Sequence, residues 1–287
     1  MNTVLNHKNK FLALGLAVAG AIYVNRKHKG ARRICGVDYP YNTVILHTWP
    51  RVKFVPNMDP FSMKLETYLR INQIPYQMDE NHENGPDNKS CLPWIEYNGK
   101  RMAGSQMIIK YLSEIWDKDL NEHLPLEDKE KATEIQTWLE EHTYWVHYHL
   151  RWYVFWDDML INMFKCPAIV NKFVRGLARW YQKKLTEEAG IGCHSDEEVK
   201  DMLVEDLRKF SDTLGDKKFI MGDTISEVDC AAFGILSQVR WCSPAECPGH
   251  QLLTGGEMQN VMDYLDRIRE MYWSDWDEIM KTAKCKI

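Results

Sequence analysis

All strand-like segments of this 287-residue chain fall within one short stretch, which most limits the folds open to it. Runs rich in β-branched and aromatic residues occur at residues 43–49, 76–79, 92–97 and 100–103. Helical patterns begin at Phe61 and Ser105, and from residue 127 onward the pattern is helical, over 127–160, 166–189, 195–214, 226–241 and 256–282. The order predicts an α+β fold, with a β-α-β-β-β-α unit at 43–119 and an all-helical domain at 127–282.

Local signals mark the turns and the boundary between these parts. Asn98-Gly99 predicts a hairpin turn, because both residues tolerate a positive φ. Ser105 is the expected N-cap of the helix that follows the last strand. Residues 120–125 are the expected boundary between the two domains. With 11 Trp, 13 Tyr and 9 Phe, the chain has too much apolar area for a disordered protein.

Charge is distributed unevenly along the chain. Residues 1–33 carry seven Lys and Arg and no acidic residue, whereas the whole chain has a formal net charge of −5. The remainder therefore has 29 basic against 41 acidic residues, a balance of −12. An acidic body repels phosphate, so we do not expect a general nucleic-acid-binding protein.

An apolar run without charges lies between the basic clusters, at residues 11–24. It predicts a short membrane anchor whose flanking lysines and arginines reach the head groups. Five basic residues follow the run and two precede it, which favours a body on the cytosolic side. Two alternatives remain: a signal peptide cleaved near Ala17-Val18-Ala19, and a buried N-terminal helix.

Eight cysteines are scattered along the chain and indicate reduced cytosolic thiols rather than a disulfide framework. A glycan at the Asn88 sequon would contradict this compartment. The one cluster of soft metal ligands is Cys242, Cys247 and His250. Because no Cys-x2-Cys pair accompanies it, we predict no metal site.

Five stretches, taken in order, identify a family resemblance over about residues 43–276. They are DPFSMKLETYLR at 59–70, LPWIEYN at 92–98, EEHTYW at 140–145, GDKKFIMG at 215–222 and SEVDCAAFG at 226–234. The chain resembles the glutathione-transferase superfamily, and most closely the branch that holds failed axon connections proteins, cadmium-responsive proteins and, further off, metaxins. The resemblance implies a thioredoxin-like N-terminal domain and a helical transferase-like C-terminal domain.

The resemblance also implies where glutathione would bind. The residue before a cis-proline offers its backbone to the tripeptide's cysteine, which here is Leu92 before Pro93. A serine at the start of the next helix, here Ser105, binds the γ-glutamyl carboxylate. The N-terminus of a helix favours a bound anion. The preceding residue is commonly acidic or an amide, whereas here it is Gly104, so one contact is lost. A plain capping role for Ser105 remains an alternative.

Transferase catalysis needs a hydroxyl or thiol at the start of the first helix. At that position the chain has Asp59, and a carboxylate cannot donate a hydrogen bond to a thiolate. Ser62, three residues later, is the candidate catalytic residue if the loop is shifted. Whether the protein is an enzyme therefore stays open.

Two further groups of residues have structural and functional interpretations. Ser226 and Asp229 form a capping box, which in transferases supports folding of the core. The helix at 138–156 is unusually aromatic, which indicates either packing between helices or a partial hydrophobic pocket. The pocket would lie near Tyr144, Tyr148 and Arg151.

Three functional hypotheses follow. The first is a membrane-anchored, cytosol-facing protein of transferase fold in a stress, cadmium or membrane-homeostasis response, which binds glutathione with weak or no catalysis. The second is an active glutathione-dependent transferase for hydrophobic electrophiles. The third is a metaxin-like scaffold on an organelle surface. We expect a lysosomal or mitochondrial outer membrane, and the superfamily allows a homodimer or another protein partner.

Overall fold

A four-stranded mixed sheet forms the N-terminal part of the protein. The computed structural model describes residues 40–80, 85–86, 92–159 and 168–283. The strands are β1 (Val44–His47), β2 (Tyr76–Asp79), β3 (Trp94–Tyr97) and β4 (Lys100–Ala103), in the spatial order β2-β1-β3-β4. β1 pairs parallel with β2 and antiparallel with β3, which pairs antiparallel with β4. The strands predicted at 76–79 and 100–103 have those bounds.

The hairpin between β3 and β4 turns at the predicted dipeptide. Asn98 has a φ of 46° and Gly99 a φ of 82°. Two successive positive φ values suit the twist of a tight hairpin, and asparagine and glycine tolerate them best. The dipeptide Asn98-Gly99 therefore determines the turn between β3 and β4.

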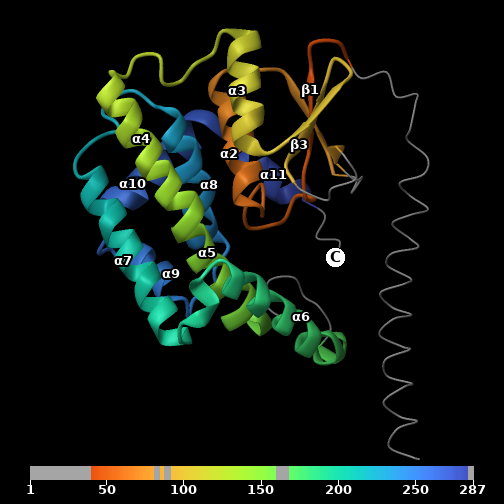
Figure 1. The fold of residues 1–287 in the computed structure, drawn as a ribbon, viewed down its shortest axis with the longest axis vertical. Coiled ribbons are helices and arrows are strands. Elements are labelled where there is room, and N and C mark those ends of the chain that lie inside the picture. Colours follow the sequence, from red (N-terminus) through yellow and green to blue (C-terminus); the bar gives the residue numbers. More distant parts are fainter. Residues whose placement is uncertain (1–39, 81–84, 87–91, 160–167, 284–287) are drawn as a thin grey trace, which may run out of the picture.

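Two helices cover one face of the sheet, α2 (Pro60–Ile71) and α3 (Ser105–Trp116). They lie between the sheet and the C-terminal helices (Figure 1). The buried layer contains Leu46, Ile95, Leu65 and Ile108, which come from β1, β3, α2 and α3. This arrangement is the thioredoxin-like domain that the resemblance implies, and a small mixed sheet followed by helices is the predicted α+β order.

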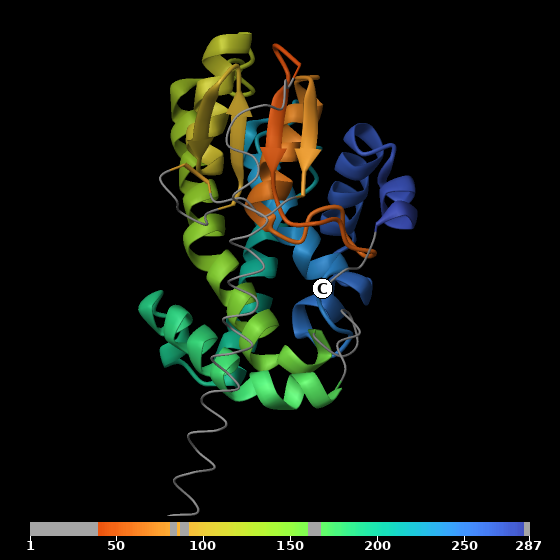
Figure 2. The same ribbon diagram turned by 90° about the vertical axis from the view of Figure 1, so that its right-hand side faces the viewer.

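In the C-terminal part, the helices described are joined by loops, one of which contains an isolated β-bridge between Phe219 and Gly222. Its first elements are α4 (Leu126–Trp138), a π-helical turn (Leu139–Thr143), α5 (Tyr144–His149), a second π-helical turn (Leu150–Val154) and α6 (Ala168–Glu188). A 3-10 turn (Ile191–Cys193) and α7 (Asp196–Leu214) follow. Figure 2 shows α6 at the end of the molecule away from the sheet. The helix predicted over 127–160 is therefore interrupted twice by wider turns.

The last elements are α8 (Glu227–Trp241), α9 (Pro248–Thr254), α10 (Gln259–Tyr272) and α11 (Trp276–Thr282). The single helix predicted over 256–282 is wrong, because the chain turns between α10 and α11. Trp273 is buried at this turn, and the Arg70 guanidinium lies 4.0 Å from its ring. Helix α9 was not predicted, since it is short, begins with Pro248 and Gly249 and is followed by Gly255.

Helix α8 is the centre of the molecule and is buried along most of its length. It packs directly on α2 at Gly234. A Cβ atom at Gly234 would overlap the carbonyl oxygen of Pro60 and lie 3.1 Å from the Lys64 amide nitrogen. Only a residue without a side chain lets the two helix backbones approach this closely.

The start of α8 is held by the predicted pair of Ser226 and Asp229. The Asp229 carboxylate accepts hydrogen bonds from the Ser226 amide and hydroxyl, both at 2.8 Å. Its other oxygen accepts from the Ile220 amide at 2.9 Å and the Tyr264 hydroxyl at 3.0 Å. The buried carboxylate therefore ties α8 to the preceding loop and to α10.

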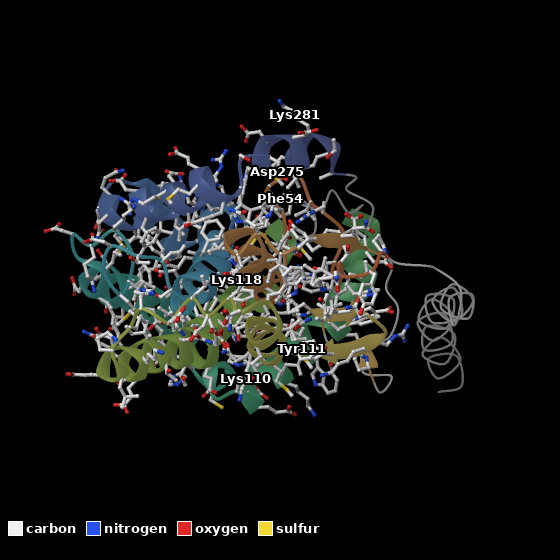
Figure 3. The ribbon with its side chains drawn as sticks, turned by 90° about the horizontal axis from the view of Figure 1, so that it is seen from above. Phe54, Lys110, Tyr111, Lys118, Asp275 and Lys281 are labelled. Carbon is white, nitrogen blue, oxygen red and sulfur yellow. The ribbon has the colours of Figure 1, made fainter. Side chains whose placement is uncertain are left out.

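A second buried carboxylate, Glu66 on α2, joins several elements. It accepts hydrogen bonds from Arg51 at 2.8 Å, from Asn57 at 2.9 Å and from Tyr76 at 2.9 Å. Arg70 lies 3.3 Å from Glu66 and pairs with Asp275 at 2.6 Å. Asp275, labelled in Figure 3, lies between α10 and α11. Burial raises the pKa of Glu66, but the charges and hydrogen bonds of its partners outweigh burial, so the net pKa is lowered.

The membrane anchor predicted at residues 11–24 lies outside the described residues. Among the helices that the structure describes, none combines the length and the apolar character needed to cross a bilayer.

We expect Gly234→Ala to lower the free energy of unfolding by about 2 kcal/mol, because the added methyl group must push α2 away from α8. Urea denaturation measures the effect. Gly176→Ala on α6 is the matched control, since nothing lies within 4 Å of its added Cβ and alanine favours helix. Equal stability of Gly234→Ala and wild type would contradict the close packing.

We expect Glu66→Gln to cost about 3 kcal/mol at neutral pH, because it leaves two arginines without their buried partner. The folded pKa is below the unfolded value of 4.5, so the ionised group stabilises the fold above that pH. The difference from wild type should shrink as the pH falls below about 4.5. Denaturation from pH 7 to about pH 3 tests this, and a difference that does not change with pH would refute it. Glu197→Gln, at an exposed pair with Lys200, should change little.

Candidate functional site

The start of α2 carries the first candidate group. Asp59 is the N-cap residue, in an extended conformation, and Pro60 occupies the first helical position. One Asp59 carboxylate oxygen accepts hydrogen bonds from the Ser62 amide at 2.7 Å and the Ser62 hydroxyl at 2.6 Å. Burial raises the pKa of Asp59, while the Ser62 hydrogen bonds and the charge of Arg151 act in the opposite direction.

Ser62, the candidate catalytic residue, lies inside the helix and is fully buried. Its hydroxyl proton points to the Asp59 carboxylate. These contacts count against a catalytic role, which stays a prediction. This pairing was not predicted, although its signal is present: an aspartate, a proline and a third-position serine are typical of a capped helix start.

A second group of residues lies at the start of α3. The Leu92–Pro93 peptide is cis, and the Gly104 amide donates to the Pro93 carbonyl at 3.3 Å. The N-cap is Gly104, so the assignment of Ser105 as N-cap is wrong by one residue. Gly104 has a φ of 89°, which glycine adopts readily, and the chain therefore enters the helix one position earlier.

Ser105 is the first residue of α3 and is largely buried. Among the described residues, its hydroxyl has no hydrogen-bond partner. The amides of the first helical turn also lack partners within the helix, and the helix dipole favours a negative charge there. The start of α3 can therefore accept a carboxylate from a ligand.

A buried lysine connects this helix start with α2. The Lys64 ammonium donates to the Gln106 side chain at 2.6 Å and to Glu140 at 2.7 Å. Gln136 also donates to Gln106, at 2.6 Å. Since Gln106 follows Ser105 directly, these bonds hold the start of α3 beside α2 and the helical domain.

The aromatic residues of α5 face the start of α2. The rings of Phe61 and Tyr144 have centroids 4.9 Å apart, and those of Tyr144 and Tyr148 are 5.7 Å apart. Burial, with a contribution from Asp59, raises the pKa of Tyr144, so its hydroxyl stays protonated. The structure thus brings apolar ring surface close to Asp59. α5 lies between the two π-helical turns, a type of irregularity often found at functional sites.

Arg151, the third residue of the predicted pocket, is buried below this surface. Its guanidinium donates to the Met58 carbonyl at 3.1 Å, to Gln238 at 3.1 Å and to the Cys242 sulfur at 2.7 Å. It therefore supports the loop that ends at Asp59 and links it to α8. A role as a pocket wall remains a prediction for Tyr144 and Tyr148, whereas Arg151 has a supporting position.

The soft metal ligands that are close in the sequence, Cys242, Cys247 and His250, are not arranged as a metal site in the structure. Cys242 accepts from Arg151, and His250 contacts the Arg240 carbonyl at 2.9 Å. Within the described ranges, no three His, Cys, Asp or Glu side chains are arranged to hold a metal ion.

A surface hollow of about 660 Å³ lies along α4, away from these groups. It is lined by Lys129, Glu130, Thr133, Glu134, Thr137 and Trp138. None of the candidate site residues contributes to it. We therefore place the candidate site at the starts of α2 and α3 and not in this hollow.

Comparison with known proteins shows the same family along both parts of the chain. A model of the glutathione S-transferase N-terminal domain matches residues 60–159, and a model of the C-terminal domain matches residues 203–268. Failed axon connections of Drosophila melanogaster is 29% identical over 84% of this chain, a match that spans 61% of that protein.

Two further similarities support the fold. Isoprene-epoxide–glutathione S-transferase of Rhodococcus sp. (strain AD45) is 27% identical over 76% of this chain and 94% of its own length. The glutathione transferase BmGSTD1 of Bombyx mori has a TM-score of 0.54 at 14% identity, over 84% of this chain and 95% of that structure. At this identity the structural likeness shows the fold alone.

We expect Asp59→Ser to raise glutathione conjugation of 1-chloro-2,4-dinitrobenzene about tenfold. A serine still caps α2 and gains a hydroxyl that can donate to a thiolate, and one unit of thiol pKa corresponds to a tenfold change in thiolate. Asp59→Ala is the control: it should stay inactive and lose about 1 kcal/mol of stability with the cap. If the serine variant folds and its rate stays at the wild-type level, the carboxylate does not explain weak catalysis.

Proposed function

Because the chain is glutathione-transferase-like in both of its domains, we propose that it binds glutathione at the starts of α2 and α3 and catalyses transfer weakly or not at all. The observation on which the weak catalysis in this proposal depends is the carboxylate of Asp59 at the start of α2. This carboxylate occupies the position at which a glutathione transferase with a catalytic residue before the proline has a hydroxyl or thiol. It accepts hydrogen bonds from the Ser62 amide and hydroxyl.

Three features of the α3 end support binding. Leu92, directly before Pro93, is the residue whose backbone the family resemblance assigns to the tripeptide's cysteine. The Ser105 hydroxyl is available next to the unpaired amides of the helix start. A γ-glutamyl carboxylate matches that combination of hydroxyl, amides and dipole.

The charge at the start of α2 opposes catalysis. An ionised Asp59 repels a thiolate, and a protonated Asp59 leaves no base close to the thiol. Arg151 directs its two terminal nitrogens to Met58, Gln238 and Cys242, and its Nε, which has no partner among the described residues, is buried. Bound glutathione would therefore keep its thiol protonated near neutral pH.

The cellular setting belongs to the same proposal. Residues 11–24 would anchor the protein in a membrane with the body facing the cytosol, at the lysosome or the mitochondrial outer membrane. Glutathione binding close to a membrane suits a stress, cadmium or membrane-homeostasis response. Binding of glutathione, and not chelation of the metal by the protein's own cysteines, would connect the protein to cadmium.

Calorimetric titration of the full chain with glutathione tests the binding. We expect Ser105→Ala to weaken binding about tenfold, since a hydrogen bond to a charged group is lost. Ser113→Ala on the same helix is the matched control, because the Ser113 hydroxyl bonds only to the Lys110 carbonyl of its own helix. Absence of binding in the wild type would contradict the proposal and favour the scaffold hypothesis.

A working transferase is the second candidate, favoured by the Phe61 and Tyr144 rings beside Asp59. Such a surface suits an apolar electrophile. Brisk turnover of 1-chloro-2,4-dinitrobenzene by the wild type, lost in Ser62→Ala, would establish it and overturn the weak-catalysis proposal.

A further inference from the structure

The groups at the start of α2 determine which form of a ligand's sulfur this end of the candidate site can accept. One oxygen of the Asp59 carboxylate accepts hydrogen bonds from the Ser62 amide at 2.7 Å and the Ser62 hydroxyl at 2.6 Å. The Ser62 hydroxyl is fully buried and directs its proton to Asp59, so it has no hydrogen left for a ligand. An ionised Asp59 therefore presents a negative charge without a donor from Ser62.

Arg151 supplies an opposing positive charge from the buried side. Burial raises the pKa of Asp59, and the charge of Arg151 acts against that rise, so the two groups lie close enough to interact. Within the described residues, Arg151 donates hydrogen bonds to three neutral groups, the Met58 carbonyl, the Gln238 side chain and the Cys242 sulfur. Asp59 therefore offsets the charge of the guanidinium, and little positive charge remains to favour a thiolate.

An aromatic surface lies beside the carboxylate. Phe61 follows Asp59 by two residues, its ring centroid is 4.9 Å from that of Tyr144, and both side chains are partly exposed. Burial, with a contribution from Asp59, raises the pKa of Tyr144, so its hydroxyl adds no second charge. A substituent on the ligand's sulfur would meet these rings, whereas a bare sulfur leaves them in contact with water.

We propose that this site selects glutathione derivatives whose sulfur carries no charge, and that thioether conjugates of glutathione are its preferred ligands. Asp59 determines this specificity, because its carboxylate repels a thiolate and does not repel a thioether. The substituent of the thioether lies on the rings of Phe61 and Tyr144. The protein thus binds what a conjugation reaction releases, and a separate enzyme must supply that product.

This inference rests on the proposed glutathione site at the starts of α2 and α3, and it adds the class of ligand. Glutathione and its thioethers have the same γ-glutamyl and glycine ends, which the start of α3 and its neighbours would bind in the same way. The two ligands differ only at the sulfur. A comparison between them therefore isolates the contribution of the start of α2.

Calorimetric titration of the full chain with glutathione and with S-methylglutathione, at pH 7 and at pH 9.5, tests the selection. A cysteine thiol has a pKa of about 8.5, so about a tenth of the glutathione is still protonated at pH 9.5. We expect the affinity for glutathione, divided by that for S-methylglutathione, to fall about tenfold over this range. The thioether is the matched ligand, because it carries every other ionisable group of glutathione.

Asp59→Asn should remove this fall. Asparagine caps a helix as well as aspartate does, so α2 keeps its start, and the charge of Arg151 is then unopposed and favours a thiolate. Asp201→Asn is the matched control, since it removes the same charge from an exposed position on α7. The control variant should show the same tenfold fall as the wild type.

A longer substituent tests the aromatic surface. We expect S-hexylglutathione to bind the wild type about tenfold more tightly than S-methylglutathione, the effect of burying about two methylene groups. Tyr144→Ala should remove most of that gain. Its affinity for S-methylglutathione should stay near the wild-type value, which shows that the variant is folded.

An affinity ratio that stays constant or rises with pH in the wild type would overturn the inference and leave the glutathione site in place. A fall that persists in Asp59→Asn would overturn it as well. Absence of binding by both ligands would contradict the proposed function itself, and with it the inference.

Discussion

The approach of α2 and α8 at Gly234 is the constraint on which the rest of the structure depends. α2 belongs to the sheet domain, and its first residues form one side of the candidate site. α8 runs through the helical domain and supports Arg151 through Gln238. Because backbone meets backbone at Gly234, the position of Asp59 is set by the packing of the whole helical domain.

The buried carboxylates show how this position is maintained. Glu66 holds the loop before α2, and Asp229 holds the start of α8. Each charge is surrounded by donors, as a buried ion requires. The buried Lys64 joins α2 to Glu140 and Gln106 in the same way. The start of α3 is thus connected to both domains through polar contacts, while the apolar layers supply most of the burial.

The sequence predicted the fold well where local chemistry is strong. Asn98-Gly99 determines its hairpin, and the family-like stretches indicate the transferase fold. It failed where tertiary contacts decide: α10 ends at Tyr272, and beyond it Arg70 lies over Trp273 and pairs with Asp275. The roles of the candidate site residues stay predictions. The pairing of Asp59 with Ser62 was missed, although the aspartate and proline at the helix start are typical of a capped helix.

Gly104 has a consequence for redesign of the ligand site. The family resemblance implies an acidic or amide side chain at this place, and an added Cβ would find open space here. The backbone, however, sits at a φ of 89° and a ψ of 113°, a region almost reserved for glycine. Installing glutamine there would therefore require the loop to be rebuilt first, so the missing ligand contact cannot be regained by one substitution.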